Sequence, residues 1–273
     1  MAQFYKAVAA GIIPKLIGKG ALIWIFDVKS NAKLYVCRTA RELVWKYSDE
    51  LIHELHTYWG LKLYHLNYPR DYISIQLNNS VNDTCPSMIY TGVQNITRIG
   101  EFAQWDNHNA SNLGIWPGRT ANFINGTEGL FFRPNLREGT PLQSFVDDVV
   151  RSFDLVNTGQ VMHLGLQALR YELPNSTFQN VTSNPANARW GSVCPNGLIY
   201  LGPTQYPEVP VYGSKPRFLD GDPVLRKKVL GLLPPNRTLH DTTIDVEPIT
   251  GANIGFKRLL QVNVKVDRST DFG

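Results

Sequence analysis

Cysteine is scarce in this 273-residue chain, and its three cysteines, Cys37, Cys85 and Cys194, are widely spaced. Three scattered cysteines are too few for a disulfide framework or a zinc site, and their odd number leaves at least one without a partner inside the chain. We therefore expect at most one disulfide bridge, and a fold that is stabilised mainly by packing.

Long apolar runs are also missing. Residues 1–26 are rich in apolar side chains, but Pro14, Lys15 and Lys19 interrupt them well before the roughly 18 residues that a membrane span requires. The same segment lacks the basic start and the cleavage site of a signal peptide. It is interpreted as one or two short apolar helices at the start of a fragment of a longer protein.

The sequence contains no recognisable catalytic or metal-binding motif. It has no nucleophile elbow, phosphate-binding loop or calcium loop, and His53 and His56 are three apart instead of four. The carboxylate pairs Asp147–Asp148 and Asp220–Asp222 are expected on a helix surface and in a turn. The sequence therefore predicts no catalytic residue, no metal site and no cofactor, and the protein is not expected to be an enzyme.

Acceptors for N-linked glycans are abundant by contrast. Eight Asn-X-Ser/Thr motifs are far more than chance predicts from the content of Asn, Ser and Thr. The predicted glycosylation sites are Asn78, Asn82, Asn95, Asn109, Asn125, Asn175, Asn180 and Asn236. Because a glycan is bulky and hydrated, each carrier must face solvent, and residues 78–236 are expected in an extracellular or lumenal compartment.

The net charge of +4 is unevenly distributed. Residues 1–50 hold eight basic side chains against four acidic ones, whereas the remaining residues are balanced. Such a local positive field attracts phospholipid headgroups, fatty-acid carboxylates or acidic protein surfaces. An ordinary solvated surface is the alternative, and nucleic acid is not expected in a glycosylated compartment.

Hydrophobic periodicity predicts a mainly β chain with appended helices, an α+β barrel or sandwich. Capping patterns predict helices over 39–51 and 141–154. Residues 73–77 and 262–266 alternate apolar and polar side chains, which is typical of strands. No repeat or linker is visible, so residues 1–273 are expected to form a single domain.

Four blocks of sequence carry a resemblance to a known family. Residues 242–266 contain D-V-E-P-I-T-G followed by K-R-L-L-Q-V-N, residues 38–47 read RTARELVWKY, residues 124–128 read INGTE, and residues 210–218 end in SKPRF. In this order, the blocks are similar to those of the class B scavenger receptor family.

The resemblance implies a membrane glycoprotein with a transmembrane helix at each end. Its ectodomain is an antiparallel β-barrel with an apical bundle of short helices and an internal lipid tunnel. Residues 1–60 would belong to the apical helical region and residues 61–273 to the barrel, with both transmembrane helices absent from the chain. The implied function is the binding and transfer or internalisation of lipids or lipoproteins at the plasma membrane or in the lysosome. Fatty acids, phospholipids and sterols are the implied lipids.

The resemblance also suggests where ligands bind. Alignment on the RTARE block places Lys29 where the fatty-acid translocase of the family has a lysine implicated in fatty-acid contact. Lys33, Lys15 and Lys19 are further candidates for the same apical basic rim. A lysine at an apolar entrance pairs with a carboxylate or phosphate while the acyl chain moves onto apolar surface.

Some positions depart from the family pattern. Ala121 and Val150 stand where the family usually has cysteine, and Lys215 and Arg217 replace Leu and His in the S-L-P-H-F block. The disulfides of the family therefore cannot be transferred to this chain.

An alternative function is a trafficking or adhesion receptor that binds a protein partner through the apical helices, including helix 39–51. A secreted glycosidase or lectin is disfavoured because the chain lacks a spaced carboxylate pair and a calcium loop.

Overall fold

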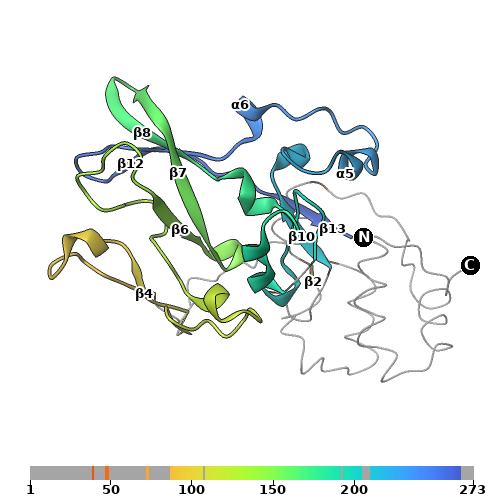
Figure 1. Ribbon diagram of the computed structural model, residues 1–273, viewed down its shortest axis with the longest axis horizontal. Coiled ribbons are helices and arrows are strands. Elements are labelled where there is room, and N and C mark those ends of the chain that lie inside the picture. The colour runs from red at the N-terminus through yellow and green to blue at the C-terminus, as the bar shows by residue number, and fades with distance from the viewer. Residues whose placement is uncertain are drawn as a thin grey trace, which may run out of the picture. The chain divides into compact units, whose positions relative to one another are not determined.

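The computed structural model describes Thr39, Tyr47–Ser48, Tyr72–Ile73 and residues 87–106, 108–191, 193–204 and 210–265 (Figure 1). The chain divides into two compact units. One unit comprises residues 84–204 and 211–263, and the other comprises residues 1–83, 205–210 and 264–273. Most of the described structure lies in the first of these units. The prediction of a single domain over 1–273 stays a prediction.

Most of the described elements are short. The strands are β1 (Tyr47–Ser48), β2 (Tyr72–Ile73), β3 (Met88–Ile89), β4 (Phe102–Trp105), β5 (His108–Asn109), β6 (Leu142–Val146), β7 (Arg151–His163), β8 (Leu166–Glu172), β9 (Ile199–Tyr200), β10 (Val211–Ser214), β11 (Thr243–Val246), β12 (Asn253–Lys257) and β13 (Gln261–Val264). The α-helices are α5 (Pro223–Lys227) and α6 (Arg237–His240). The 3₁₀ helices are η2 (Ile96–Arg98), η3 (Arg119–Asn122), η4 (Asp147–Val149), η5 (Asn175–Phe178), η6 (Pro185–Trp190), η7 (Gly202–Thr204) and η8 (Pro216–Phe218).

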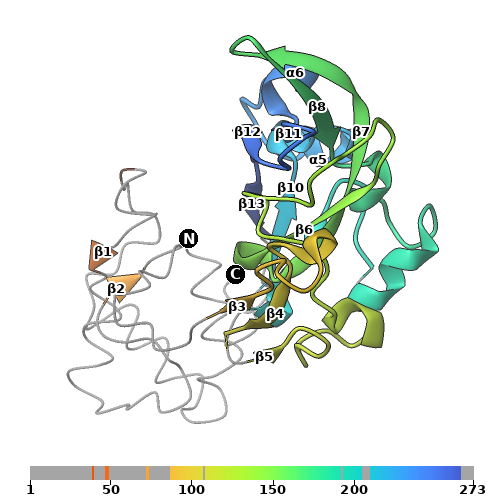
Figure 2. The same cartoon turned by 90° about the vertical axis from the view of Figure 1, so that its left-hand side faces the viewer.

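The largest described sheet has five antiparallel strands in the order β12-β11-β8-β7-β6, and it curls as an open half-barrel (Figure 2). Strands β7 and β8 form a long hairpin that closes at Leu164 and Gly165, both with positive φ, as tight hairpin turns require. Smaller antiparallel sheets have the orders β13-β10-β9 and β3-β4-β5. The expectation of a mainly antiparallel β fold with short helices is confirmed. The lipid tunnel is not a feature that the described residues show, and it stays a prediction.

The principal core lies against the five-stranded sheet. Its members come from β6, β7, β8, β11 and the segment before β6, and they are Phe132, Leu136, Leu142, Leu155, Leu169, Tyr171, Ile244 and Val246. Each large apolar side chain buried in this way contributes about 1.5–3 kcal/mol to folding. The D-V-E-P-I-T-G block thus begins on a central strand whose apolar residues are buried.

The predicted helix over 141–154 is wrong. Leu142–Val146 form strand β6 and Arg151–His163 form β7, which pair antiparallel from Leu142↔Leu155 to Val146↔Arg151. The turn between them is η4, followed by Val150 in the left-handed region with φ 49° and ψ 48°. The apolar spacing fits a helix, but the pairing of β6 with β7 uses the backbone groups that a helix would need.

The predicted helix over 39–51 is wrong at Tyr47–Ser48, which form β1 and pair antiparallel with β2. The other residues of that helix lie outside the described part of the chain, except Thr39, which is in no regular element.

The predicted strand over 262–266 is confirmed as far as β13 extends. Its valines face outward: Val262 is 49% exposed. The inward amide of Asn263 donates to Ser214 Oγ at 3.0 Å.

A buried lysine organises the segment around η8. The Lys215 side chain is 2% exposed, and its Nζ lies 3.0 Å from Asp220 Oδ2 and 2.9 Å from Asp241 Oδ1. Arg237 reaches the same two carboxylates, with Nη1 2.7 Å from Asp241 Oδ2 and a short contact to Asp220. Two cations and two carboxylates therefore form a closed cluster, which we call the Lys215 cluster.

The Lys215 cluster explains a departure from the family pattern. Where the family resemblance expects leucine, an ammonium group is buried, and such a group is tolerated only with matched carboxylates. Asp220 lies in an exposed turn, as expected, and its carboxylate is also a member of this cluster. Its ion pair with Arg237 joins the two ends of the segment that contains α5.

We expect Lys215→Met to lower the free energy of unfolding by about 3 kcal/mol, because the substitution leaves Asp241 buried with only one cation. Denaturant unfolding followed by tryptophan fluorescence measures this change. Lys227→Met, at an exposed lysine of α5, is the matched control and should change stability by less than about 0.5 kcal/mol. Adding Asp241→Asn to Lys215→Met should restore part of the loss. Equal stability of Lys215→Met and the wild type would contradict the role of the cluster.

Candidate functional site

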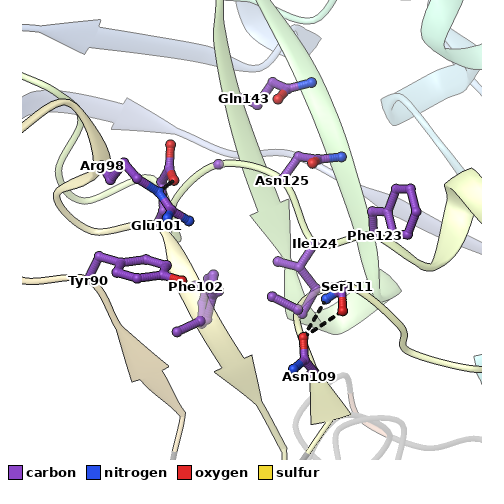
Figure 3. A pocket seen from close by; sticks show the side chains of 13 residues that line it. Tyr90, Arg98, Glu101, Phe102, Asn109, Ser111, Phe123, Ile124, Asn125 and Gln143 are labelled. Atoms are coloured by element: carbon purple, nitrogen blue, oxygen red, sulfur yellow. Dashed lines mark hydrogen bonds and ion pairs between the residues drawn. The ribbon is translucent and has the colours of Figure 1, made fainter. Parts of the chain in front are cut away.

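The candidate site is a pocket of about 460 Å³ beside strand β4 (Figure 3). Tyr90, Arg98 and residues 101–103 form one side, residues 109–111 form another, and residues 123–126 with Gln143 complete it. Its volume lies within the range of small-molecule sites, although its lining is more polar than is usual for them. Figure 3 shows Tyr90, Glu101 and Phe102 across the pocket from Asn125 and Ile124.

Arg98 and Glu101 supply the charged groups of this pocket. Arg98 Nε donates to Glu101 Oε2 at 2.9 Å, and the guanidinium carbon lies 3.7 Å from the centre of the Tyr90 ring. The hydrogen bond to Glu101 raises the pKa of Arg98 above its ordinary value. Because the two charges neutralise each other, the pocket is suited to a polar, uncharged group that stacks on Tyr90 or hydrogen-bonds to the amides. Sequence reasoning missed this pair, whose only signal was the i, i+3 spacing of opposite charges.

Two predicted glycan acceptors, Asn109 and Asn125, line the same pocket, and both are exposed. Asn109 Oδ1 accepts hydrogen bonds from the backbone N and the hydroxyl of Ser111, at 2.9 and 2.7 Å (Figure 3). Asn95 binds Thr97 in the same way, at 3.0 and 2.7 Å. In both motifs the carboxamide oxygen accepts from the third residue of the acceptor sequence, and within the described part of the chain the nitrogen that would carry a sugar makes no hydrogen bond.

The other acceptors vary in exposure. Asn175 and Asn236 are exposed, whereas Asn180 is half-buried. Asn236 caps α6 by accepting from Leu239 N at 3.3 Å. Asn78 and Asn82 lie outside the described residues. The exposed acceptors therefore meet the steric requirement for a glycan, and their modification stays a prediction.

The glycines of two motif blocks are required by close backbone contacts. Gly126 of INGTE has φ +85°, and a side chain there would meet Gln143 O at 2.0 Å. Gly251 of the D-V-E-P-I-T-G block has φ +78°, and a side chain would meet Phe132 O at 2.2 Å. Only glycine combines this φ with such a close approach. The motifs therefore hold one turn against β6 and another against the segment that carries Phe132.

Glu247 orders the turn of the second motif. Its carboxylate accepts from Ile249 N at 2.9 Å, from Thr250 N at 2.7 Å and from the Thr250 hydroxyl at 2.6 Å. The hydrogen bond from the Thr250 hydroxyl is the main reason why the pKa of Glu247 lies below its ordinary value. The Glu247 carboxylate and Gly251 of this motif therefore have structural roles in its turn.

Arg151 is a second buried charged group, and no carboxylate of the described residues pairs with it. Arg151 is 2% exposed, and its guanidinium carbon lies 4.3 Å from the ring centres of both Trp116 and Trp190. It donates to Tyr200 O, but among the described residues its Nε has no hydrogen-bond partner. Burial lowers the pKa of Arg151 to about 9, so the group is still charged at neutral pH. The two indole faces supply the stabilisation that a carboxylate would otherwise give.

The predicted apical ligand residues Lys15, Lys19, Lys29 and Lys33 lie outside the described residues, as do His53 and His56. Of the expected carboxylate pairs, Asp148 pairs with Arg258 at 3.0 Å and Asp222 caps α5. Within the described ranges, no group of three or more His, Cys, Asp or Glu side chains is arranged to hold a metal ion. No helix in the described part of the chain is long and apolar enough to cross a membrane.

The described residues form a β-rich protein, and its turns contain motif blocks on which the resemblance rests. A family model supports this assignment: the model of the CD36 family matches residues 8–273. The chain therefore belongs to the CD36 family, and the expected relationship to class B scavenger receptors is confirmed.

Individual relatives support the same assignment. Scavenger receptor class B member 1 of Sus scrofa is 26% identical, with 93% of this chain and 51% of that protein covered. The protein of the same name from Bos taurus is 29% identical, with 86% and 44% covered. Lysosome membrane protein 2 of Mus musculus is 26% identical, with 88% and 48% covered. The chain spans about half the length of the curated relatives it matches.

We expect Glu247→Gln to lower the free energy of unfolding by about 1 kcal/mol at neutral pH, because glutamine keeps only one acceptor oxygen for the turn. The folded-state pKa of Glu247 is depressed, so its contribution is present above the ordinary pKa of glutamate and is lost as pH falls through the depressed value. Unfolding curves at several pH values should therefore show the variant and the wild type converging under acid. A difference that persists at low pH would argue against a role for the charge.

We expect glycans at the exposed acceptors Asn95, Asn109, Asn125, Asn175 and Asn236 when the chain passes through a secretory pathway. Peptide mass spectrometry after enzymatic glycan release in ¹⁸O water detects each modified asparagine as labelled aspartate. Ser111→Ala should abolish the signal at Asn109 only, whereas Ser111→Thr should retain it. Absence of label at all five positions would exclude the compartment that the acceptors predict.

Proposed function

We propose that the whole protein is a class B scavenger receptor-like membrane glycoprotein that binds lipids or lipoproteins and transfers or internalises them. The main support is the match to the CD36 family over residues 8–273, together with similarity to proteins named scavenger receptor class B member 1. Fatty acids, phospholipids and sterols are the proposed lipids. The plasma membrane and the lysosomal membrane are the proposed locations.

The proposed mechanism is non-covalent. A lysine of the apical basic rim, Lys29 first, pairs with the carboxylate or phosphate of the ligand. The acyl chain then leaves water for the apolar tunnel, which stabilises the complex by about 0.8 kcal/mol for each buried methylene. This sequence of events needs no general acid, no nucleophile and no cofactor.

A trafficking receptor is the second candidate function. It is favoured by the similarity to a protein named lysosome membrane protein 2. In this alternative the apical helices bind a protein partner, and the tunnel carries no lipid. Lipid uptake distinguishes the two functions, because only the first requires saturable uptake.

The decisive test is uptake of labelled fatty acid and of labelled lipoprotein by cells that express the full-length protein. We expect saturable uptake, and Lys29→Gln should raise the half-saturation concentration about two- to fivefold, as the loss of an exposed ion pair predicts. Lys46→Gln, in the same basic region but outside the proposed rim, is the matched control. Normal surface expression without saturable uptake of either ligand would refute the lipid function and favour the trafficking alternative.

A further inference from the structure

The segment 221–236 is a projecting loop that is fixed at both ends. Asp220 and Arg237, which flank it, form an ion pair within the Lys215 cluster. Inside the loop, Asp222 begins α5 by accepting from Val224 N at 2.9 Å. Figure 1 shows α5 and the following turns in the loop that leads to α6. The loop is therefore presented on a rigid base.

The outer surface of this loop is strongly apolar. Leu230 is 98% exposed, Leu233 is 62% exposed and Val224 is 51% exposed. Leu225 and Leu232 are half-buried instead, so the loop has an inward side that already packs on the protein. Single exposed apolar residues are common, but several on one short loop mark a contact surface.

The same loop carries unpaired positive charge. Arg226, Lys227 and Lys228 are consecutive, and the sequence from 223 to 240 contains no acidic residue. None of the three forms an ion pair with another residue in the described part of the chain, whereas Arg98, Arg170 and Arg258 all do. The fold therefore leaves these cations available.

We propose that residues 223–233 form a docking surface for the headgroup layer of an anionic phospholipid membrane. Leu230 and Leu233 insert among the acyl chains at the interface, while Lys227 and Lys228 pair with phosphate and carboxylate groups. Exposed leucines beside a basic cluster are the combination that interfacial membrane segments use. None of these residues belongs to the lysines of the proposed apical rim or to the lining of the pocket beside β4.

A second exposed apolar segment provides a comparison within the molecule. The tip of the β7–β8 hairpin also exposes apolar side chains, with Leu164 at 94% and Met162 at 69%. Its nearest strand arginine, Arg170, is held in a two-point ion pair with Asp245 at 2.7 Å for each contact. The hairpin tip thus has exposed leucine without free cations, which makes it a matched control for the charged loop.

The test is sedimentation of the glycosylated full chain with vesicles of phosphatidylcholine, alone or mixed with phosphatidylserine. We expect binding to the mixed vesicles that weakens with added salt, and little binding to phosphatidylcholine alone. Lys227→Glu with Lys228→Glu should lower the partition coefficient about tenfold or more, since each lysine near an anionic surface adds measurably to binding. Leu230→Ser with Leu233→Ser should cause a similar loss.

Two controls make the outcome specific. Leu164→Ser at the hairpin tip and Arg137→Glu at an exposed arginine outside the loop should bind like the wild type. The proposal is overturned if the wild type does not bind the mixed vesicles, including the case in which a glycan at Asn236 shields the loop. It is also overturned if Lys227→Glu with Lys228→Glu leaves vesicle binding unchanged. Equal binding to vesicles without phosphatidylserine overturns it as well.

This inference rests on the proposed function in that the protein works at a membrane or lipid surface, but the two can fail separately. Loss of vesicle binding in the loop variants together with absent lipid uptake by cells leaves the docking surface and refutes the receptor. If uptake is saturable and unchanged in the loop variants but no vesicle binding is seen, the receptor function stands and the docking surface is refuted.

Discussion

A buried ammonium group must be matched by carboxylates, and this requirement fixes much of the C-terminal half of the described structure. Lys215 is held between Asp220 and Asp241, and Arg237 bridges the same two acids from the solvent side. The cluster therefore ties three places together: the segment around η8, the start of α6 and the entry to β11. Because β11 contributes Ile244 and Val246 to the principal core, the pairing of these charges is coupled to the position of the largest sheet. The exposed loop with its leucines and lysines is carried on this base.

Aromatic packing around Ala121 and Val150 is a second constraint on the fold. The family resemblance expects cysteines at Ala121 and Val150, yet both positions are buried and apolar here. Val150 takes a left-handed conformation that a β-branched residue adopts only under strong support. Its carbonyl accepts from the indole of Trp116 at 2.9 Å, and Trp116 packs edge-to-face on Trp190 at 5.2 Å. The two tryptophans, with Arg151 between them, therefore support this region by packing.

Sequence reasoning succeeded where a motif has one physical solution. The glycines of INGTE and of D-V-E-P-I-T-G each sit at positive φ against a neighbouring carbonyl, so the motifs identify the family because the contacts allow no other residue. It failed at 141–154, where Phe145 and Val149 have helical spacing but belong to a strand and its turn. The spacing of apolar residues does not reveal that β7 pairs with this segment, and that pairing decides that residues 142–146 form a strand. The apical lysines lie outside the described residues, so their role was neither supported nor excluded.

The sequence by itself determined the family, the mainly antiparallel β class and the glycan acceptors, because each depends on residue types at fixed local spacing. Only the tertiary structure decided which charges are buried and which are free. Lys215 and Lys227 are the same residue type, twelve positions apart in the sequence, yet one is enclosed by carboxylates and the other faces solvent. Their difference comes from residues that are distant in sequence, such as Asp241, and distant contacts are formed only when the chain folds.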